Sequence, residues 1–230
     1  MRWIPLEPDF AVTATLWRVL DEAEQTRADR FAFTIDKTSY IVAHALLRVM
    51  LSKEAGIAPG DWKFRAGPGG KPQIDSSAGH PDLRFSLSHT RGMVSVAVGR
   101  FHDLGVDVES WREAVPVLEI ARRFFAPAEA ELIAGLPLSE QNQAFYRLWT
   151  LKEAFVKATG QGIAAPIDGF AFSLDPVEIR FLPPERGHPD EWQFAEVRPG
   201  PGHRLALAVR RAASDPARLD LGALDVQHLV

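Results

Sequence analysis

The sequence predicts an α+β fold, because two different hydrophobic periods occur in separate stretches of the chain. Between residues 36 and 55, the apolar residues Tyr40, Ala43 and Leu47 recur at helical spacing, and Gly56 follows the segment. From Leu83 onward the period falls to two, as in strands with one buried face. Hairpin-like strands grouped between helices favour this class over a doubly wound parallel sheet.

The other elements follow in order from the same signals. Apolar spacing and capping residues predict helices over residues 13–30, 36–55, 116–125, 127–134 and 139–159, the last capped by Ser139. Alternating apolar residues predict strands over residues 83–88, 94–98, 104–109, 170–174, 177–182, 192–197 and 205–210. Helices come first and strands follow in each half, so we expect two similar halves, residues 1–110 and 111–230.

Composition excludes several classes of protein. The chain has 230 residues, 46% of them hydrophobic, which is enough for a sizeable core. A net charge of −4 gives no global basic field, so no nucleic-acid partner is expected. The absence of cysteine excludes disulfides and thiolate metal sites. The first residues lack a signal-peptide pattern, and no apolar run is long enough for a bilayer, so a cytoplasmic protein without a membrane partner is expected.

Two carboxylates lie close together on one predicted strand. Asp107 and Glu109 are two residues apart, so their side chains leave the same face, while Val106 and Val108 leave the other. Carboxylates this close repel each other unless a cation neutralises them, and oxygen ligands favour Mg²⁺. For this pair alone, the commoner explanation is the solvent-exposed side of an edge strand.

A second charged pair lies on the last predicted helix. Glu153 and Lys157 are four residues apart, a spacing that usually marks a surface ion pair. That helix also carries one apolar stripe through Leu151 and Phe155 and further apolar groups around Trp149. A helix that is apolar on two sides is packed on two sides, which would place Glu153 and Lys157 between packed layers.

Two weaker signals lie between these elements. Ser88 and His89 are neighbours at a strand end, but successive strand residues point to opposite faces, and the pattern is not a nucleophile elbow. A histidine in such a position is more often structural, although it can contact a phosphate. Lys71 ends a glycine-rich loop that is not a P-loop, because Pro72 follows where Ser or Thr would be needed.

Four segments in this order resemble the Sfp-type 4′-phosphopantetheinyl transferase family. They are Gly-Lys-Pro at 70–72, Phe-Ser-Leu-Ser-His-Thr at 85–90, Gly-Val-Asp-Val-Glu at 105–109, and Trp-Thr-Leu-Lys-Glu-Ala-Phe-Val-Lys-Ala-Thr-Gly-Gln-Gly at 149–162. Each segment alone is a weak to moderate signal, whereas the ordered set is specific. The resemblance implies two similar α+β halves with the active site in the cleft between them.

The resemblance also implies a role for individual residues. Coenzyme A would be the substrate, and Mg²⁺ would be held against its pyrophosphate by Asp107, Glu109 and Glu153. The other implied contacts with coenzyme A are Lys157 at the transferred phosphate, Lys152 alongside the phosphates, Ser88, His89 and Arg27 at the ribose 3′-phosphate, and Lys71 at the adenosine. Arg65 is the nearest arginine before the Gly-Lys-Pro turn, one residue out of register with that of many relatives.

The implied reaction is the attack of a carrier-protein serine on the β-phosphate of coenzyme A, with release of 3′,5′-ADP. Glu153 would be the base for the serine proton, and Lys157 would stabilise or protonate the leaving oxygen. At 230 residues the chain resembles the self-contained, monomeric members of the family. The carrier protein is expected to dock near Phe124, Phe125 and Leu132.

Two other functions remain open at this point. The three carboxylates would also suit a Mg²⁺-dependent phosphohydrolase or nuclease, although a nuclease needs a basic track that the net charge does not suggest. A carrier-protein or nucleotide binding module without activity is the non-enzymatic alternative.

Overall fold

The structure is a computed structural model that describes residues 1–7, 14–67, 72–111, 115–162, 166–184, 187–211 and 217–229. Its α-helices in these ranges are α1 (Ala14–Val19), α2 (Glu22–Ala28), α3 (Thr34–Ala55), α4 (Val117–Phe124), α5 (Pro127–Ala134) and α6 (Leu138–Thr159). Its strands are β1 (Arg2–Pro5), β2 (Phe64–Ala66), β3 (Pro72–Ile74), β4 (Leu83–Thr90), β5 (Met93–Arg100), β6 (Leu104–Ser110), β7 (Phe170–Leu174), β8 (Val177–Phe181), β9 (Trp192–Val197), β10 (His203–Arg210) and β11 (Gly222–Ala223). The predicted α+β class is confirmed.

The strands form two larger sheets and two hairpins. One sheet has the order β11-β1-β5-β4, and the other has the order β6-β10-β9. β2 pairs with β3, and β7 pairs with β8. The strand β6, which the sequence analysis assigned to the first half, therefore pairs with β10 of the second half. Conversely, β11, which lies near the end of the chain in the second half, pairs with β1 of the first half.

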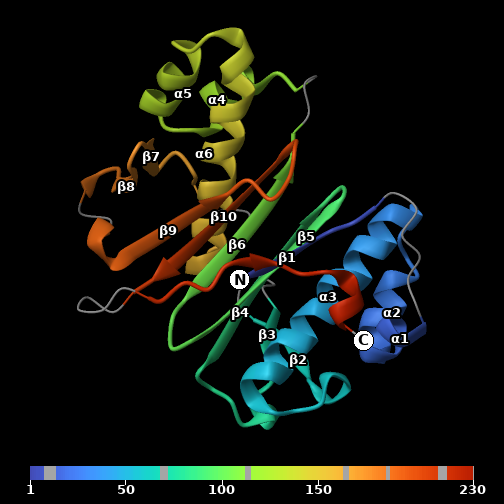
Figure 1. Cartoon of the computed structure of the whole chain (residues 1–230). Coiled ribbons are helices and arrows are strands. Elements are labelled where there is room, and N and C mark those ends of the chain that lie inside the picture. The colour runs from blue at the N-terminus through green and yellow to red at the C-terminus, as the bar shows by residue number, and fades with distance from the viewer. Residues whose placement is uncertain are drawn as a thin grey trace.

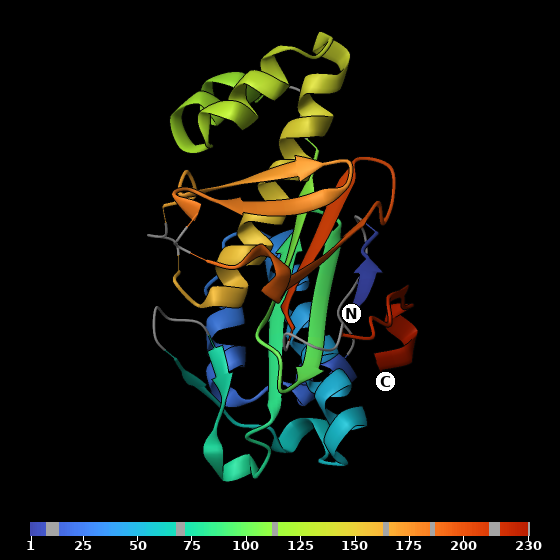
Figure 2. The same cartoon turned by 90° about the vertical axis from the view of Figure 1, so that its left-hand side faces the viewer.

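The helices lie at opposite ends of the molecule, with the strands between them. Figures 1 and 2 show α1, α2 and α3 at one end and α4 and α5 at the other. The long helix α6 runs from the α4–α5 end along β6 and β10, against which it packs. The helix α3 packs against β4 and β5. No helix in the described ranges is both long and apolar enough to cross a bilayer.

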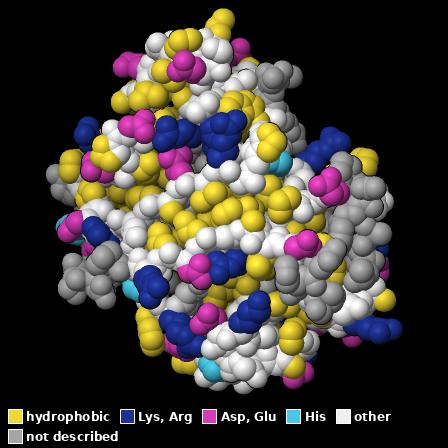
Figure 3. Space-filling view, in the orientation of Figure 1, with side chains coloured by type: hydrophobic (Ala, Val, Ile, Leu, Met, Phe, Trp, Pro, Cys, Tyr) yellow, Lys and Arg dark blue, Asp and Glu magenta, His cyan; other side chains and the backbone are white. Residues whose placement is uncertain are grey.

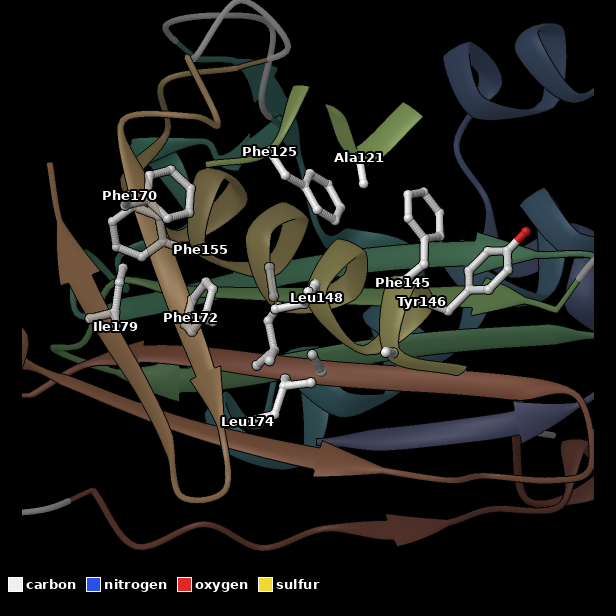
Figure 4. Close-up of a cluster of buried hydrophobic side chains, with 14 of the residues drawn as sticks. Ala121, Phe125, Phe145, Tyr146, Leu148, Phe155, Phe170, Phe172, Leu174 and Ile179 are labelled. Carbon is white, nitrogen blue, oxygen red and sulfur yellow. The ribbon is translucent and has the colours of Figure 1, made fainter. Parts of the chain in front are cut away.

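Each of the two long helices is the centre of its own hydrophobic core. Leu46 and Leu51 of α3 have no exposed surface, and they pack in a cluster with Trp62. The core around α6 is rich in aromatic side chains, which Figure 4 shows gathered on both sides of that helix. Both helices end at a glycine with positive φ, Gly56 at 72° and Gly160 at 71°, where a left-handed residue closes the last turn.

Most predicted elements are present within two residues of their expected ends. The β-hairpin 83–98, the helices α3, α4 and α5, and the four strands between 170 and 210 are confirmed. The predicted cap at Ser139 is wrong, because α6 begins at Leu138 after Pro137. The segment 13–30 holds two short helices, and the strands β1, β2, β3 and β11 were not predicted.

Side-chain hydroxyl groups join the two sheets where β4 lies beside β6. The backbone N–H groups of Val106, Val108 and Ser110 donate to hydroxyl oxygens on β4. The three acceptors are Ser86 Oγ at 3.1 Å, Ser88 Oγ at 3.4 Å and Thr90 Oγ1 at 3.3 Å. Hydroxyl groups thus satisfy donors of the β6 edge where no strand is paired with it.

Candidate active site

The strand β6 lies directly against α6 because Gly105 has no side chain. A Cβ atom at this position would lie 2.0 Å from the carbonyl oxygen of Ala154 and 2.5 Å from the backbone nitrogen of Ala158. This close approach brings the next polar residue of β6, Asp107, to the helix face that carries Glu153 and Lys157.

Asp107 is the centre of a buried polar cluster. Its side chain is only 6% exposed, and its Oδ1 accepts hydrogen bonds from Lys157 Nζ at 2.6 Å and from Ser88 Oγ at 2.9 Å. Lys157 also donates to Ser88 Oγ at 3.0 Å. The sequence reasoning therefore brought the right strand and helix together, and the alternative of a solvent-exposed edge is wrong for Asp107.

Glu153 faces the same cluster. Burial raises the pKa of Glu153, the negative charge of Asp107 raises it further, and Lys157 opposes both effects. Glu153 is therefore held where the charge of Asp107 disfavours its ionised form. Glu109 is half-buried two residues beyond Asp107 on β6, opposite Arg204 of β10.

These residues fit a hard cation. The Oδ2 atom of Asp107 is buried and has no hydrogen-bond partner, so one of its oxygens is available as a ligand. The donor set of Asp107, Glu153 and Glu109 consists of carboxylate oxygens, which Mg²⁺ prefers. Within the described ranges, however, no three such side chains are already gathered as a complete metal site. Ligands from a bound substrate would be needed to complete the coordination.

Ser88 is placed differently from its prediction. Its hydroxyl group is buried between Asp107 and Lys157, and its single proton is donated to Asp107. Its expected contact with a ribose 3′-phosphate stays a prediction, and in this structure the hydroxyl group faces the carboxylates instead. The reason is the alternation of β4, which directs Ser88 toward the carboxylates and its neighbour His89 to the opposite face.

Lys152 is also placed differently from its prediction. Its ammonium group is buried in the second core, where it pairs with Glu129 Oε2 at 2.7 Å. It also donates to the carbonyl oxygens of Ile167 and Phe170, each at 2.7 Å. All three donors of the ammonium group are engaged in this structure, and the expected contact of Lys152 with the phosphates stays a prediction. It ties α6 to α5 and to the start of β7.

His89 lies among cationic groups at the other end of the cluster. Part of its ring is exposed, yet partial desolvation lowers its pKa, and the charges of His44, Lys157 and Arg27 lower it further. The exposed guanidinium of Arg27 lies over the ring of Tyr40, 5.9 Å from its centroid. His89 is therefore within electrostatic reach of both Arg27 and Lys157.

His44 belongs to this neighbourhood, although the sequence analysis did not select it. Its signal was available, because Tyr40, His44 and Arg48 recur every fourth residue and make a polar stripe along α3. Burial raises the pKa of Tyr40 to about 12, and the negative charge of Glu24 adds to the shift. The Tyr40 hydroxyl therefore stays protonated beside these histidines.

A cleft of about 430 Å³ extends from the end of α6 toward the β2–β3 hairpin. Its lining comes from both halves of the chain and includes Arg65, Gln73, His80, Arg84, Phe85, Thr159 and Gly160. Arg65 thus lines the cleft, as an exposed residue of β2. Lys71 lies outside the described residues.

The surface as a whole carries both signs of charge. Figure 3 shows Lys and Arg interspersed with Asp and Glu over one face, where hydrophobic side chains form a band across the middle. The net charge of −4 agrees with this mixture. The positive charge around His89 is therefore a local feature.

Comparison with known proteins identifies the family. A profile described as 4′-phosphopantetheinyl transferase, N-terminal, matches residues 1–100, and one described as 4′-phosphopantetheinyl transferase superfamily matches residues 103–209. The 4′-phosphopantetheinyl transferase HetI of Nostoc sp. is 31% identical over 90% of this chain and 93% of its own. The 4′-phosphopantetheinyl transferase Sfp of Bacillus subtilis is 30% identical over 80% and 79% of the two chains.

Among solved structures, the holo-[acyl-carrier-protein] synthase of Thermotoga maritima is similar at a TM-score of 0.38 and 21% identity, over 47% of this chain and 62% of that one. The HetI match spans nearly the full length of both sequences. The chain therefore belongs to the 4′-phosphopantetheinyl transferase family, enzymes that transfer phosphopantetheine from coenzyme A to carrier proteins.

Proposed function

We propose that this enzyme transfers the 4′-phosphopantetheine arm of coenzyme A to a serine of an apo acyl or peptidyl carrier protein, depends on Mg²⁺, and releases 3′,5′-ADP. The observation that carries the proposal is the buried cluster of Asp107, Lys157 and Ser88, with Glu153 beside it. A carboxylate oxygen without a partner and a cation on the other oxygen of the same residue suit a pyrophosphate held by a metal.

Asp107, Glu109 and Glu153 would hold the Mg²⁺ ion. When bound, the ion offsets the negative charge of the pyrophosphate. Lys157 contacts the phosphate that is transferred, and its ammonium group stabilises charge on the leaving oxygen. Its present bond to Asp107 keeps the ammonium group oriented toward the place where that charge develops.

Glu153 is the proposed base for the carrier serine. The serine oxygen forms a bond to the β-phosphorus, the bond from that phosphorus to the oxygen of the 3′,5′-ADP part breaks, and Glu153 receives the serine proton directly or through water. The experiment for these roles is single-turnover transfer by Glu153→Gln, which should be slowed by roughly a hundredfold or more. A rate within a few-fold of wild type would remove Glu153 from the mechanism.

Arg27 and His89 are proposed to bind the ribose 3′-phosphate, because the positive charges of Arg27 and Lys157 act together at His89. The cleft at the end of α6 is the proposed adenosine site. Lys71 is proposed to contact the adenosine, as the family resemblance implies. The carrier protein is proposed to dock on α4 and α5 through Phe124 and Leu132, which are 43% and 39% exposed. Phe125, expected at the same surface, is 4% exposed and packs in the core instead.

We also propose that the chain acts as a monomer, because Asp107, Glu153 and Lys157 meet within one chain. A cytoplasmic location is proposed as well. Sedimentation of the active enzyme tests the first point. The function itself is tested by incubating the protein with coenzyme A, Mg²⁺ and an apo carrier protein. Carrier mass increase together with 3′,5′-ADP supports transfer. Hydrolysis of coenzyme A without carrier modification would indicate a phosphohydrolase, and binding without either product a non-catalytic module.

A further inference from the structure

A histidine of α3 is held in place by a carboxylate of α2. His44 Nδ1 lies 2.7 Å from Glu24 Oε1, and the His44 ring packs on Tyr40 with the centroids 4.1 Å apart. The His44 side chain is 14% exposed, and that of Glu24 is 9% exposed. One ring nitrogen is therefore fixed inside the protein, and Nε2 is left for a group outside this pair.

The charges around Glu24 balance only when His44 is included. Arg48 is fully buried and binds Glu24 Oε2 and Asp21 Oδ2, together with the carbonyl oxygens of Pro59 and Trp62. Glu24 Oε2 also accepts from the backbone N–H of Asp21. Two carboxylates thus face one guanidinium, and a positive charge on His44 makes the cluster neutral. Glu24 is thus shared between Arg48 and His44 through its two oxygens, and its side chain is 9% exposed.

His44 lies against the same aromatic ring as Arg27, because the centroid of the Tyr40 ring is 4.1 Å from that of the His44 ring and 5.9 Å from the guanidinium carbon of Arg27. Of the charged groups that lower the pKa of His89, His44 has the largest effect, followed by Lys157 and Arg27, and Asp36 acts in the opposite direction. Cationic side chains from α2, α3 and α6 therefore converge on a histidine of β4. Such a concentration of positive charge is unfavourable by itself and favourable for a dianionic phosphate.

We propose that His44 is a further recognition residue for the ribose 3′-phosphate of coenzyme A, with Glu24 as the residue that positions its ring. The inference rests on the proposed function, which puts that phosphate beside Arg27 and His89. Glu24 holds Nδ1 so that the protonated ring presents its Nε2–H to the phosphate. Substrate selection at this site then extends one residue beyond Arg27 and His89.

The test compares two ligands that differ only in this phosphate, coenzyme A and 3′-dephospho-coenzyme A. The variant His44→Asn places an amide nitrogen near the position of Nδ1 and can keep the bond to Glu24, while Nε2 and the charge are lost. Binding of each ligand is measured by calorimetry without a carrier protein. The matched control is His102→Ala, since His102 Nδ1 also lies at a fixed partner, the carbonyl oxygen of Arg210, away from this site.

We expect His44→Asn to weaken coenzyme A binding about tenfold, as for loss of a charge-assisted hydrogen bond, and to leave 3′-dephospho-coenzyme A within twofold. His102→Ala should change neither. Glu24→Gln removes the charged partner that holds the His44 ring. It should therefore also reduce the preference for coenzyme A over 3′-dephospho-coenzyme A. An unchanged preference in His44→Asn, or equal weakening of both ligands with a lower melting temperature, would overturn the inference and leave His44 as a structural residue.

Failure of the proposed function gives a different result. If the wild-type protein does not modify an apo carrier but His44→Asn still narrows the ligand preference, the transfer function falls and the phosphate site stands. If the wild-type protein modifies the carrier and His44→Asn keeps the same preference for coenzyme A over 3′-dephospho-coenzyme A, only the role proposed for His44 is wrong.

Discussion

The two carboxylate oxygens of Asp107 have different surroundings. Lys157 and Ser88 both bond to Oδ1, while Oδ2 is buried without a partner. A buried carboxylate oxygen without a hydrogen bond is costly, so its persistence points to a ligand that is absent from the free protein. The ion pair with Lys157 engages Oδ1 and leaves Oδ2 as the oxygen that a cation could bind.

The ion pair predicts a stability effect for Lys157→Met. Removing the ammonium group leaves Asp107 facing Glu153 without a cation, which should cost about 1–2 kcal/mol in the metal-free protein, since the Lys157 side chain is 30% exposed. The double variant Asp107→Asn/Lys157→Met should recover most of this loss. Urea unfolding of both single variants and the double variant measures the coupling. Additive effects would show that the pair contributes no interaction energy.

The lowered pKa of Glu24 predicts that its contribution to the free energy of unfolding depends on pH. Burial raises its pKa, but the hydrogen bond and charge of His44 and the charge of Arg48 outweigh burial, so the net shift is downward from 4.5. A carboxyl group with a lowered pKa stabilises the fold above its unfolded value and loses that contribution as pH falls through the folded value. Glu24→Gln should therefore cost about 2–3 kcal/mol at pH 7, and much less near pH 3.

The measurement is the free energy of unfolding of wild type and Glu24→Gln between pH 7 and pH 3. Glu22→Gln is the matched control, because Glu22 lies on the same helix and is exposed. Its difference from wild type should be small at every pH. A difference for Glu24→Gln that stays constant over the whole range would contradict the assignment.

At the level of elements, two serines in the contact between β4 and β6 should differ in their effects on stability and on activity. Ser86 and Ser88 both accept a backbone N–H of β6, but only Ser88 also bonds to Asp107 and Lys157. Ser86→Ala should cost about 1–3 kcal/mol, because the buried N–H of Val106 loses its acceptor, with specific activity retained. Ser88→Ala should lose transfer activity as well. Thermal unfolding and the rate of carrier modification are measured for both variants. Equal transfer activities of Ser86→Ala and Ser88→Ala would contradict a separate role for Ser88.

The sequence predicted the elements better than their partners. Helical spacing and Gly56 located α3, and alternation located the β4–β5 hairpin, because these signals are local. The burial of Lys152 depends on Glu129, which lies on another helix, and no local pattern connects them. The orientation of Ser88 depends likewise on the position of β6. Asp107, Glu153 and Lys157 were found together because the family motif already contains their tertiary relation.

At the level of the whole molecule, the proposed ligands bind where residues from both halves of the chain come together. The carboxylates and Lys157 come from β6 and α6, while Arg27, His44 and His89 come from α2, α3 and β4. The cleft at the end of α6 also has walls from both halves. A ligand that spans this junction and completes the metal coordination should couple the two halves.

This coupling predicts how ligands stabilise the enzyme. Since no three carboxylate or histidine side chains in the described ranges form a complete metal site, Mg²⁺ alone should raise the melting temperature little. Coenzyme A alone should raise it through the cationic groups, and both together should raise it by more than the sum, because each ligand increases the affinity for the other. With both at about 100 times their dissociation constants, the stabilisation should exceed roughly 2.7 kcal/mol, or about 5–10 °C for a chain of this size.

Thermal unfolding with Mg²⁺, with coenzyme A, and with both provides the measurement. Asp107→Asn is the matched variant: it should keep the increase caused by coenzyme A alone and lose the extra increase caused by Mg²⁺, since it removes a charged ligand and leaves the cationic groups in place. Strictly additive increases in the wild-type protein would mean that the metal and the substrate bind independently. In that case Asp107, Glu109 and Glu153 would not share an ion with the pyrophosphate, and the mechanism proposed for Lys157 would have to work without it.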